Sequence, residues 1–152
     1  MKIMTYNKAM IGAGCFWGIE EYFQKLNNVI ETKVGYSGGN FPNPSYEDVC
    51  TGKTGHAEVV LIKYNTNLTY ENILDHFWKC HDPSQLNRQG PDIGTQYRSV
   101  IFYYDELQKE IAKNSKDKFQ TTFSKKIATT IEEAKELYIA EEYHQCYIKK
   151  NF

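Results

Sequence analysis

A single cysteine in an unusual local context is the first candidate for chemistry. Cys15 lies in the run Gly14-Cys15-Phe16-Trp17-Gly18, where a short apolar segment gives way to a helical pattern. Unpaired N–H groups at the start of a helix and the positive end of its dipole both favour the thiolate, the reactive form of cysteine. Gly14 permits a tight turn, and the rings of Phe16 and Trp17 offer apolar faces. The run therefore predicts a nucleophile beside a pocket that fits a methyl group.

Burial in the core is the alternative for these side chains, because free cysteine is among the most buried residue types. Successive helical residues point in different directions. Phe16 and Trp17 therefore cannot both join the inward-facing stripe formed by Ile19, Phe23 and Leu26. We expect at least one of the two rings to line an opening.

Six further segments accompany the run at Cys15. They are 36–39 (YSGG), 44–50 (PSYEDVC), 51–58 (TGKTGHAE), 81–83 (HDP), 94–99 (GTQYRS) and 142–145 (EYHQ). Together and in this order, the seven segments resemble the peptide methionine sulfoxide reductases of the A type. The resemblance covers nearly the whole chain. It implies reduction of methionine S-sulfoxide, free or in proteins, to methionine, and hence the repair of oxidised proteins.

Reduction of a sulfoxide requires a thiolate that attacks the sulfur, an acid that protonates the oxygen, and hydrogen-bond donors around the S–O bond. By the resemblance, Cys15 is the nucleophile and Glu58 is the acid, whose protonated form a half-buried pocket would favour. Tyr46 and Tyr97 match the tyrosines that hydrogen-bond the oxygen. Asp92 matches a loop aspartate that supports them.

The resemblance also implies how the substrate is held and how the enzyme is regenerated. Phe16 and Trp17 bind the substrate methyl group. Attack by Cys15 releases methionine and leaves a sulfenic acid on the cysteine. A second thiol then condenses with it, and thioredoxin or another thiol reduces the resulting disulfide. The resemblance implies no bound cofactor.

The second thiol is open, because Gly18 occupies the position where some relatives carry a cysteine and the chain has no Gly-rich tail. Cys146, the C-terminal thiol, is the first candidate for the resolving cysteine, and Cys80 is the second. Cys50 matches a position that is commonly cysteine in relatives without a recycling role, so we interpret it as structural. A direct attack by an external thiol is a further route.

A Cys-His hydrolase is a competing function from another enzyme class. Cys15 would be its nucleophile and His56, His81 or His144 its base. Such an enzyme would turn over an ester or amide without any reductant. The resemblance disfavours it, since the segments around His56 and His144 already belong to the reductase pattern.

Two further alternatives involve no redox catalysis. Cys80-His81 with His144 and Cys146 could bind a metal, but the spacing matches no zinc signature, and we expect no metal. A protein-binding domain without chemistry is the other alternative. It would leave methionine sulfoxide untouched at any thiol concentration.

Hydrophobic periodicity indicates which elements position these residues. Strands are expected over 9–13, 32–36, 58–64, 97–104 and 127–131. Helices are expected over 16–26, from an N-cap at Thr69 to Cys80, from a capping box at Asp105 and Gln108 to about Phe123, and over 140–150. The segments 40–44 and 84–96 are expected to be loops.

This order of elements predicts an α+β fold, a two-layer mixed sheet with packed helices and a ferredoxin-like (split βαβ) core. A length of 152 residues, 41% of them hydrophobic, suits one core, so we expect a single reductase domain over 1–152.

The composition restricts the partners. With 18 basic and 19 acidic residues, the chain shows no electrostatic preference for nucleic acid or a membrane surface. No apolar run approaches the roughly 20 residues that span a bilayer, and the N-terminus shows no signal peptide. The four cysteines form no CxxC pair, as is usual in a reducing compartment. We therefore expect a cytoplasmic monomer.

Overall fold

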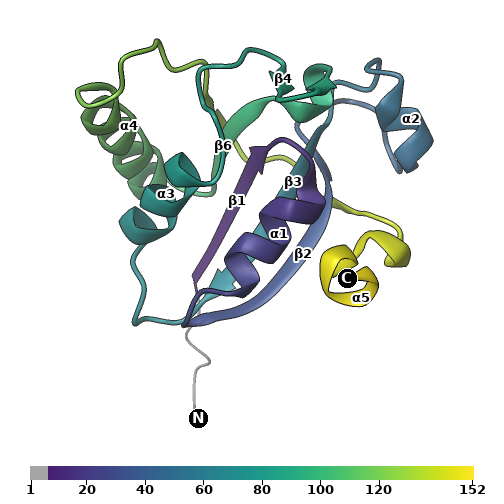
Figure 1. Ribbon diagram of the computed structural model, residues 1–152, viewed down its shortest axis with the longest axis horizontal. Helices are drawn as coiled ribbons and strands as arrows, with labels where there is room; N and C mark the ends of the chain where they lie inside the picture. Colours follow the sequence, from purple (N-terminus) through teal and green to yellow (C-terminus); the bar gives the residue numbers. More distant parts are fainter. Residues whose placement is uncertain (1–6) are drawn as a thin grey trace.

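The computed structural model describes residues 7–152; the N-terminal residues on which the signal-peptide prediction rests, 1–6, lie outside the described residues. A six-stranded sheet in the order β7-β6-β1-β3-β2-β8 organises the fold (Figure 1). Its strands are Asn7–Ala13 (β1), Val29–Ser37 (β2), Ala57–Tyr64 (β3), Ser99–Tyr103 (β6), Thr130–Glu133 (β7) and Tyr138–Ile139 (β8). Only β6 and β7 pair in parallel. The predicted α+β class with a mixed sheet is confirmed.

A third strand lies between the two strands that helix α1 (Phe16–Gln24) connects, and another between the two that helix α3 (Tyr70–Lys79) connects, whereas the strands on either side of helix α4 (Glu106–Gln120), β6 and β7, are direct neighbours. β3 lies between β1 and β2, the two strands that α1 connects. β1 in turn lies between β3 and β6, and α3 connects β3 to the next long strand, β6. The end of β1 therefore lies near the centre of the sheet, and the chain leaves it directly into Cys15 and α1.

The remaining helices are short, apart from one. They are α2 (Tyr46–Cys50), α4 (Glu106–Gln120), α5 (Tyr147–Asn151) and the 3₁₀ turns η1 (Thr95–Tyr97) and η2 (Glu142–His144). Thr69 is the N-cap of α3, as predicted, and it also forms a complete capping box with Asn72. Asp105 accepts from the N–H of Gln108 at the start of α4, as predicted, but the Gln108 side chain bonds Tyr104 and Lys8 instead of closing the box. Among residues 7–152, no helix is both long and apolar enough to cross a membrane.

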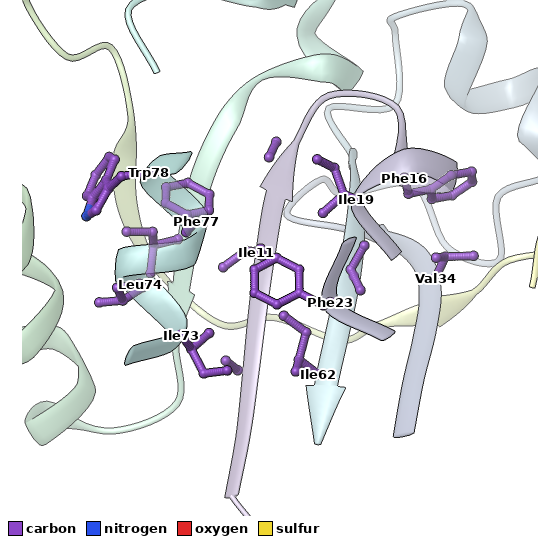
Figure 2. Close-up of a cluster of buried hydrophobic side chains, with 14 of the residues drawn as sticks. Ile11, Phe16, Ile19, Phe23, Val34, Ile62, Ile73, Leu74, Phe77 and Trp78 are labelled. Atoms are coloured by element: carbon purple, nitrogen blue, oxygen red, sulfur yellow. The ribbon is translucent and has the colours of Figure 1, made fainter. Parts of the chain in front are cut away.

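The main core lies between the sheet and the helices. Ile11, Val34 and Ile62 of the sheet face Phe23 of α1 and Phe77 of α3 (Figure 2). The alternate residues of the same strands form a smaller cluster on the other face of the sheet, which includes Met10, Val59 and Phe102. Because strand side chains alternate, Glu58 lies on the same face as Val60 and Ile62, under the helices.

Several predicted boundaries differ from the structure. The predicted loop 84–96 contains a two-residue hairpin of β4 (Arg88–Gln89) and β5 (Asp92–Ile93). The strands expected over 97–104 and 127–131 lie at Ser99–Tyr103 and Thr130–Glu133. The helix expected over 140–150 is broken into η2 and α5, because Cys146 adopts a left-handed backbone conformation with φ +52°.

Candidate active site

Cys15 lies where β1 ends and α1 begins, as the sequence predicts. It is the half-buried N-cap residue of α1, with φ −57° and ψ 121°. Gly14 before it has φ +99°, and a Cβ atom there would lie 2.8 Å from the side chain of Gln89. Both the conformation and the close approach of β4 therefore require glycine. The start of α1, β4 and α2 all lie at one end of the sheet (Figure 1).

The Cys15 thiol is held in its protonated form. Burial, together with the negative charges of Glu58 and Asp92, raises its pKa to about 11. Hydrogen bonds from the backbone N–H groups of Trp17 and Gly18 lower the pKa, as expected at a helix start. The thiolate predicted from the helix start alone is not the resting form, because desolvation outweighs these two donors. The proton must leave Cys15 during the reaction.

Glu58 supplies an acid next to this thiol. Its side chain is 2% exposed, and its Oε1 accepts a hydrogen bond of 3.2 Å from the N–H of Phe16, the residue after Cys15. Burial raises the pKa of the Glu58 carboxyl from 4.5 to about 8 despite that hydrogen bond, and the charge of Asp92 adds to the shift. Glu58 is therefore mostly protonated at neutral pH.

Tyr97 faces the same site. It ends η1 and is half-buried. Burial, together with the charges of Glu58, Cys50, Asp92 and Cys15, raises the pKa of its hydroxyl to about 12. Tyr97 and Asp92 are therefore within electrostatic range of Cys15 and Glu58.

Tyr46 is the first residue of α2. Burial raises the pKa of its hydroxyl, and so do a hydrogen bond with the Cys50 thiol and the charges of Glu58 and Tyr97. The hydroxyls of Tyr46 and Tyr97 therefore both remain protonated and able to donate hydrogen bonds at neutral pH.

The two rings that follow Cys15 differ in exposure. Phe16 is 1% exposed and packs against Tyr36, with ring centroids 5.8 Å apart. Trp17 is half-buried. Its indole Nε1 donates a hydrogen bond of 2.9 Å to Nδ1 of His144, and its ring stacks on Tyr147 at 3.7 Å. Trp17 is therefore the ring that leaves the core.

Three histidines were candidates for the base of a hydrolase, and each has other partners. His56 binds the backbone of Gly39 and Phe41 through its two ring nitrogens, at 3.0 and 2.7 Å. His81 binds the Phe77 carbonyl at 2.8 Å and the Ser99 hydroxyl at 2.7 Å. His144 accepts from Trp17. In the described part of the chain, none of these three histidines makes a hydrogen bond to Cys15, as the base of a Cys-His hydrolase would.

The proposed metal ligands do not gather into one group. Cys80 and His81 lie at the end of α3, whereas Cys146 lies against α1. Among residues 7–152, no three or more His, Cys, Asp or Glu side chains are arranged to hold a metal ion.

Cys146, the first candidate for the resolving cysteine, is held along α1. Its N–H donates to Oε1 of Glu20 at 2.7 Å, and its sulfur lies 3.1 Å from the side-chain nitrogen of Gln24. These partners follow Cys15 by five and nine residues, which corresponds to about 7 to 14 Å along the helix axis. A disulfide requires Cα atoms within about 7 Å. Cys146 must therefore leave Glu20 and Gln24 before it can reach Cys15.

The other two thiols differ in their accessibility. Cys80 donates to the Phe77 carbonyl, and burial raises the pKa of its thiol to about 12, so that it is a weak nucleophile at neutral pH. Cys50 is exposed and bonds the Tyr46 hydroxyl. The interpretation of Cys50 as a structural thiol without a recycling role stays a prediction.

Sequence reasoning missed several residues that build the walls of the site. The Glu141 carboxylate accepts from the Tyr36 hydroxyl and from the N–H of Tyr46, both at 2.9 Å. It thereby fixes the start of α2. His144 and Tyr147 hold Trp17. The motif at 142–145 marked the region, but its side chains have no pattern that predicts partners more than 100 residues away.

A cysteine at a helix start, a buried protonated carboxyl beside it and two tyrosine hydroxyls define a thiol-dependent enzyme with its own acid, on an α+β fold. Comparisons with known proteins make this more specific. Residues 7–152 match the family model of peptide methionine sulfoxide reductase. A peptide methionine sulfoxide reductase MsrA from Methanothermobacter thermautotrophicus is 52% identical over 154 residues, which cover 99% of this chain and 91% of the relative.

Solved structures agree with the sequence comparison. The reduced form of Mxr1 from Saccharomyces cerevisiae superposes with a TM-score of 0.91 at 40% identity, covering 96% of this chain and 86% of Mxr1. The same yeast protein in complex with Trx2 gives a TM-score of 0.63 at 25% identity, covering 97% and 89%. The chain belongs to the peptide methionine sulfoxide reductase family, type A. It is an enzyme that reduces methionine sulfoxide.

Proposed function

We propose that Cys15 and Glu58 together carry out the reduction of methionine S-sulfoxide, free or within proteins. The observation that carries this proposal is the buried Glu58 carboxyl, which bonds the residue next to Cys15 and has a pKa of about 8. An acid that keeps its proton at neutral pH is what the leaving oxygen of a sulfoxide requires.

The first step transfers oxygen from substrate to enzyme. The Cys15 sulfur attacks the sulfoxide sulfur, Glu58 gives its proton to the oxygen, and the thiol proton of Cys15 restores the acid. Methionine leaves, and the hydroxyl remains on Cys15 as a sulfenic acid. The methionine sulfur gains two electrons and Cys15 loses two, so the step balances without a cofactor.

The polar side chains around this pair would hold the S–O bond. The Tyr46 and Tyr97 hydroxyls remain protonated and can donate to the oxygen, and Asp92 lies close enough to affect the pKa of both Cys15 and Glu58. Trp17 presents its ring to the methyl group, with Phe16 buried beneath. Such preformed donors stabilise the charge that develops on oxygen in the transition state.

Regeneration uses a second thiol and then an external dithiol. The sulfenic acid condenses with a thiol to give a disulfide and water, and thioredoxin reduces the disulfide by exchange. The complex of the yeast relative with Trx2 supports thioredoxin as the partner. We propose Cys146 as the resolving thiol, after release from Glu20, with Cys80, Cys50 or an external thiol as the alternatives.

The state of the four cysteines bears on the cellular compartment of the enzyme. All four cysteines are free, which supports a reducing compartment. We propose that residues 1–152 act as one monomeric reductase domain in the cytoplasm.

The test of the chemistry uses both epimers of methionine sulfoxide with dithiothreitol as the reductant. We expect methionine from the S epimer alone and none from Cys15→Ser. A reagent that traps sulfenic acids, such as dimedone, should label Cys15 when the S epimer is added without reductant. A dimedone adduct on another cysteine, or turnover by Cys15→Ser, would refute the proposal.

The test of regeneration compares thioredoxin with dithiothreitol in three serine variants, at Cys146, Cys80 and Cys50. Cys146→Ser should retain turnover with dithiothreitol, which attacks the sulfenic acid directly, and lose it with thioredoxin. Full thioredoxin-driven turnover in Cys146→Ser would remove Cys146 as the resolving thiol. Loss of thioredoxin-driven turnover in Cys80→Ser or Cys50→Ser would then identify that cysteine as the resolving thiol, and full turnover in all three variants would favour the external thiol.

A further inference from the structure

Gln89, in β4, is bonded through both polar atoms of its side-chain amide to one residue outside the hairpin. Its Oε1 accepts a hydrogen bond of 2.9 Å from the N–H of Asp82, and its Nε2 donates one of 2.9 Å to the carbonyl of the same residue. Such a pair of bonds allows the amide one orientation. The side chains of Gln85 and Arg88 also bond the hairpin, at Gly90, but from within the loop. Gln89 therefore links the hairpin to the segment after α3.

The segment around Asp82 is itself fixed to the sheet. The ring of His81, the preceding residue, bonds the Ser99 hydroxyl at 2.7 Å. Ser99 is the first residue of β6 and pairs with Ala13, the last residue of β1. The bonds of Gln89 therefore hold the hairpin to a point beside the end of β1, from which the chain enters the active site.

The stem of Gln89 also packs on the residue before the nucleophile. A Cβ atom on Gly14 would lie 2.8 Å from both Cβ and Cγ of Gln89, so the backbone of Gly14 and this stem are in close contact. Gln89 pairs with Asp92 in the antiparallel register of the hairpin. Side chains of directly opposite residues lie on the same face of a hairpin. The face that rests on Gly14 therefore also carries Asp92, in agreement with the effect of the Asp92 charge on the pKa of Cys15.

We propose that Gln89 is a positioning residue, which holds the β4–β5 hairpin in place and with it the Asp92 carboxylate near the Cys15 thiol. The inference rests on the proposed function, in which Cys15 is the nucleophile and Asp92 is one of the polar groups around it. Without the two bonds to Asp82, the hairpin keeps the contact of the Gln89 stem but loses its fixed orientation, and Asp92 moves away from the thiol. Gln89 thus acts on the reaction through Asp92.

Asp92 is the charged group near the thiol at neutral pH. Glu58 of β3 and Tyr97 of η1 are also within electrostatic range of Cys15. With pKa values of about 8 and about 12, both are mostly protonated at pH 7. The negative charge near Cys15 at this pH therefore comes mainly from Asp92. A reagent that senses this charge reports where the hairpin holds Asp92.

The test compares the alkylation of Cys15 by iodoacetate, an anion, with that by neutral iodoacetamide at pH 7, followed by mass spectrometry of the Cys15 peptide. A nearby carboxylate slows the anionic reagent more than the neutral one, so the ratio of the two rates reports the charge. Gln89→Met keeps the methylene stem on Gly14 and removes both bonds to Asp82. We expect its ratio of iodoacetate to iodoacetamide rates to rise about three- to tenfold. An opening that only exposes the thiol would increase both rates together.

Matched variants separate the position of the charge from a loss of stability. Gln120→Met removes the same kind of amide bonds in the loop after α4, where Gln120 accepts from the N–H of Ile127 at 3.0 Å and donates to the carbonyl of Lys125 at 2.8 Å. It should leave the ratio unchanged. Asp92→Asn should raise the ratio as Gln89→Met does, and the double variant should show no further increase.

A single turnover of pre-reduced enzyme provides a second readout. Displacement of a catalytic group by about 1 Å can cost on the order of 100-fold in rate, so Gln89→Met should form methionine about tenfold more slowly or less, whereas Gln120→Met should keep the rate of the wild type. Gln89→Asn is the second variant if Gln89→Met does not fold. Its amide is one methylene too short to reach Asp82, and we expect the same two results.

Three outcomes would each overturn the inference: an unchanged ratio in the Gln89 variants, an equal rise in Gln120→Met, or a further rise in the double variant over Asp92→Asn alone. An unchanged ratio in Asp92→Asn would also overturn it, because Asp92 would then not be the charge near the thiol. The failure of the proposed function is distinguishable, since it appears in the wild type as a dimedone adduct on a cysteine other than Cys15.

Discussion

Replacing Glu58 by glutamine tests the role of the acid most directly. Glutamine has nearly the same shape, and its amide oxygen can still accept the hydrogen bond of 3.2 Å from the N–H of Phe16. What it lacks is the transferable proton. The change should therefore slow the protonation of the sulfoxide oxygen and affect the binding of substrate less.

The size of the effect follows from the raised pKa. With its ordinary pKa of 4.5, Glu58 would be protonated in about 0.3% of molecules at pH 7, whereas with a pKa of about 8 it is protonated in about 90%. Burial thus increases the amount of acid about 300-fold. A positioned general acid contributes about 10²- to 10⁴-fold to a rate, and we expect Glu58→Gln to lose a factor in this range at pH 7.

The assay is a single turnover of pre-reduced enzyme without reductant, followed by the amount of methionine formed per Cys15 between pH 6 and pH 10. Because the charge of Glu58 also raises the pKa of Cys15, the ionisation of Cys15 is measured in both proteins from the pH dependence of its alkylation. The ratio of the two rates, corrected for this ionisation, isolates the acid role of Glu58. Above pH 8 the wild type loses its protonated acid. The ratio should therefore be constant at low pH and fall about tenfold per unit above pH 8.

Glu47→Gln is the matched control, since Glu47 is an exposed carboxylate on α2. It should leave the single-turnover rate unchanged at every pH. A ratio of wild type to Glu58→Gln that does not depend on pH, or rates that are equal, would refute the assignment of Glu58 as the acid.

Three other predictions concern stability and accessibility. Because folding raises the pKa of Glu58 from 4.5 to about 8, the folded state keeps a proton that the unfolded state releases between these pH values. As the pH rises through this range, the unfolding free energy of the wild type should therefore fall relative to that of Glu58→Gln by about 1.4 kcal/mol per pH unit. Urea titrations measure both free energies, and parallel curves against pH would contradict the prediction. Gly14→Ala should lower the free energy of unfolding by about 1–3 kcal/mol, because φ is +99° and the added methyl group meets Gln89. Gly18→Ala has nothing within 4 Å of the added methyl group and should instead raise the free energy of unfolding by about 0.5–1 kcal/mol. Equal effects of the two substitutions on Tm would contradict the reasoning. Glu20→Ala removes the buried carboxylate that accepts the hydrogen bond of the Cys146 N–H, an interaction worth about 1–3 kcal/mol. The rate of Cys146 alkylation should therefore increase about tenfold. Glu21→Ala, on the exposed side of α1, is the control, and equal alkylation rates in the two variants would refute the role of Glu20.

The regular elements could be predicted from the sequence because their side chains repeat with the period of the backbone. Alternation along β3 and the stripe of Phe23 and Ile19 on α1 place these residues in the core without further information. The short elements could not be predicted in this way. The five residues of α2, the β4–β5 hairpin and the break at Cys146 are each too short for a periodic pattern to repeat, and contacts with distant residues decide them.

For the site, too, the sequence predicts some features and leaves others to the tertiary structure. The sequence by itself determined that Cys15 lies at a helix start and, through the ordered motifs, which side chains we propose to act with it. Only the tertiary structure decided the state of those groups. Burial makes Cys15 a thiol and Glu58 a protonated acid, and the contacts that matter join Phe16 to Glu58 across 42 residues and Trp17 to His144 across 127. The physical reason is that desolvation and charge depend on what surrounds an atom in space, which the order of residues along the chain does not specify.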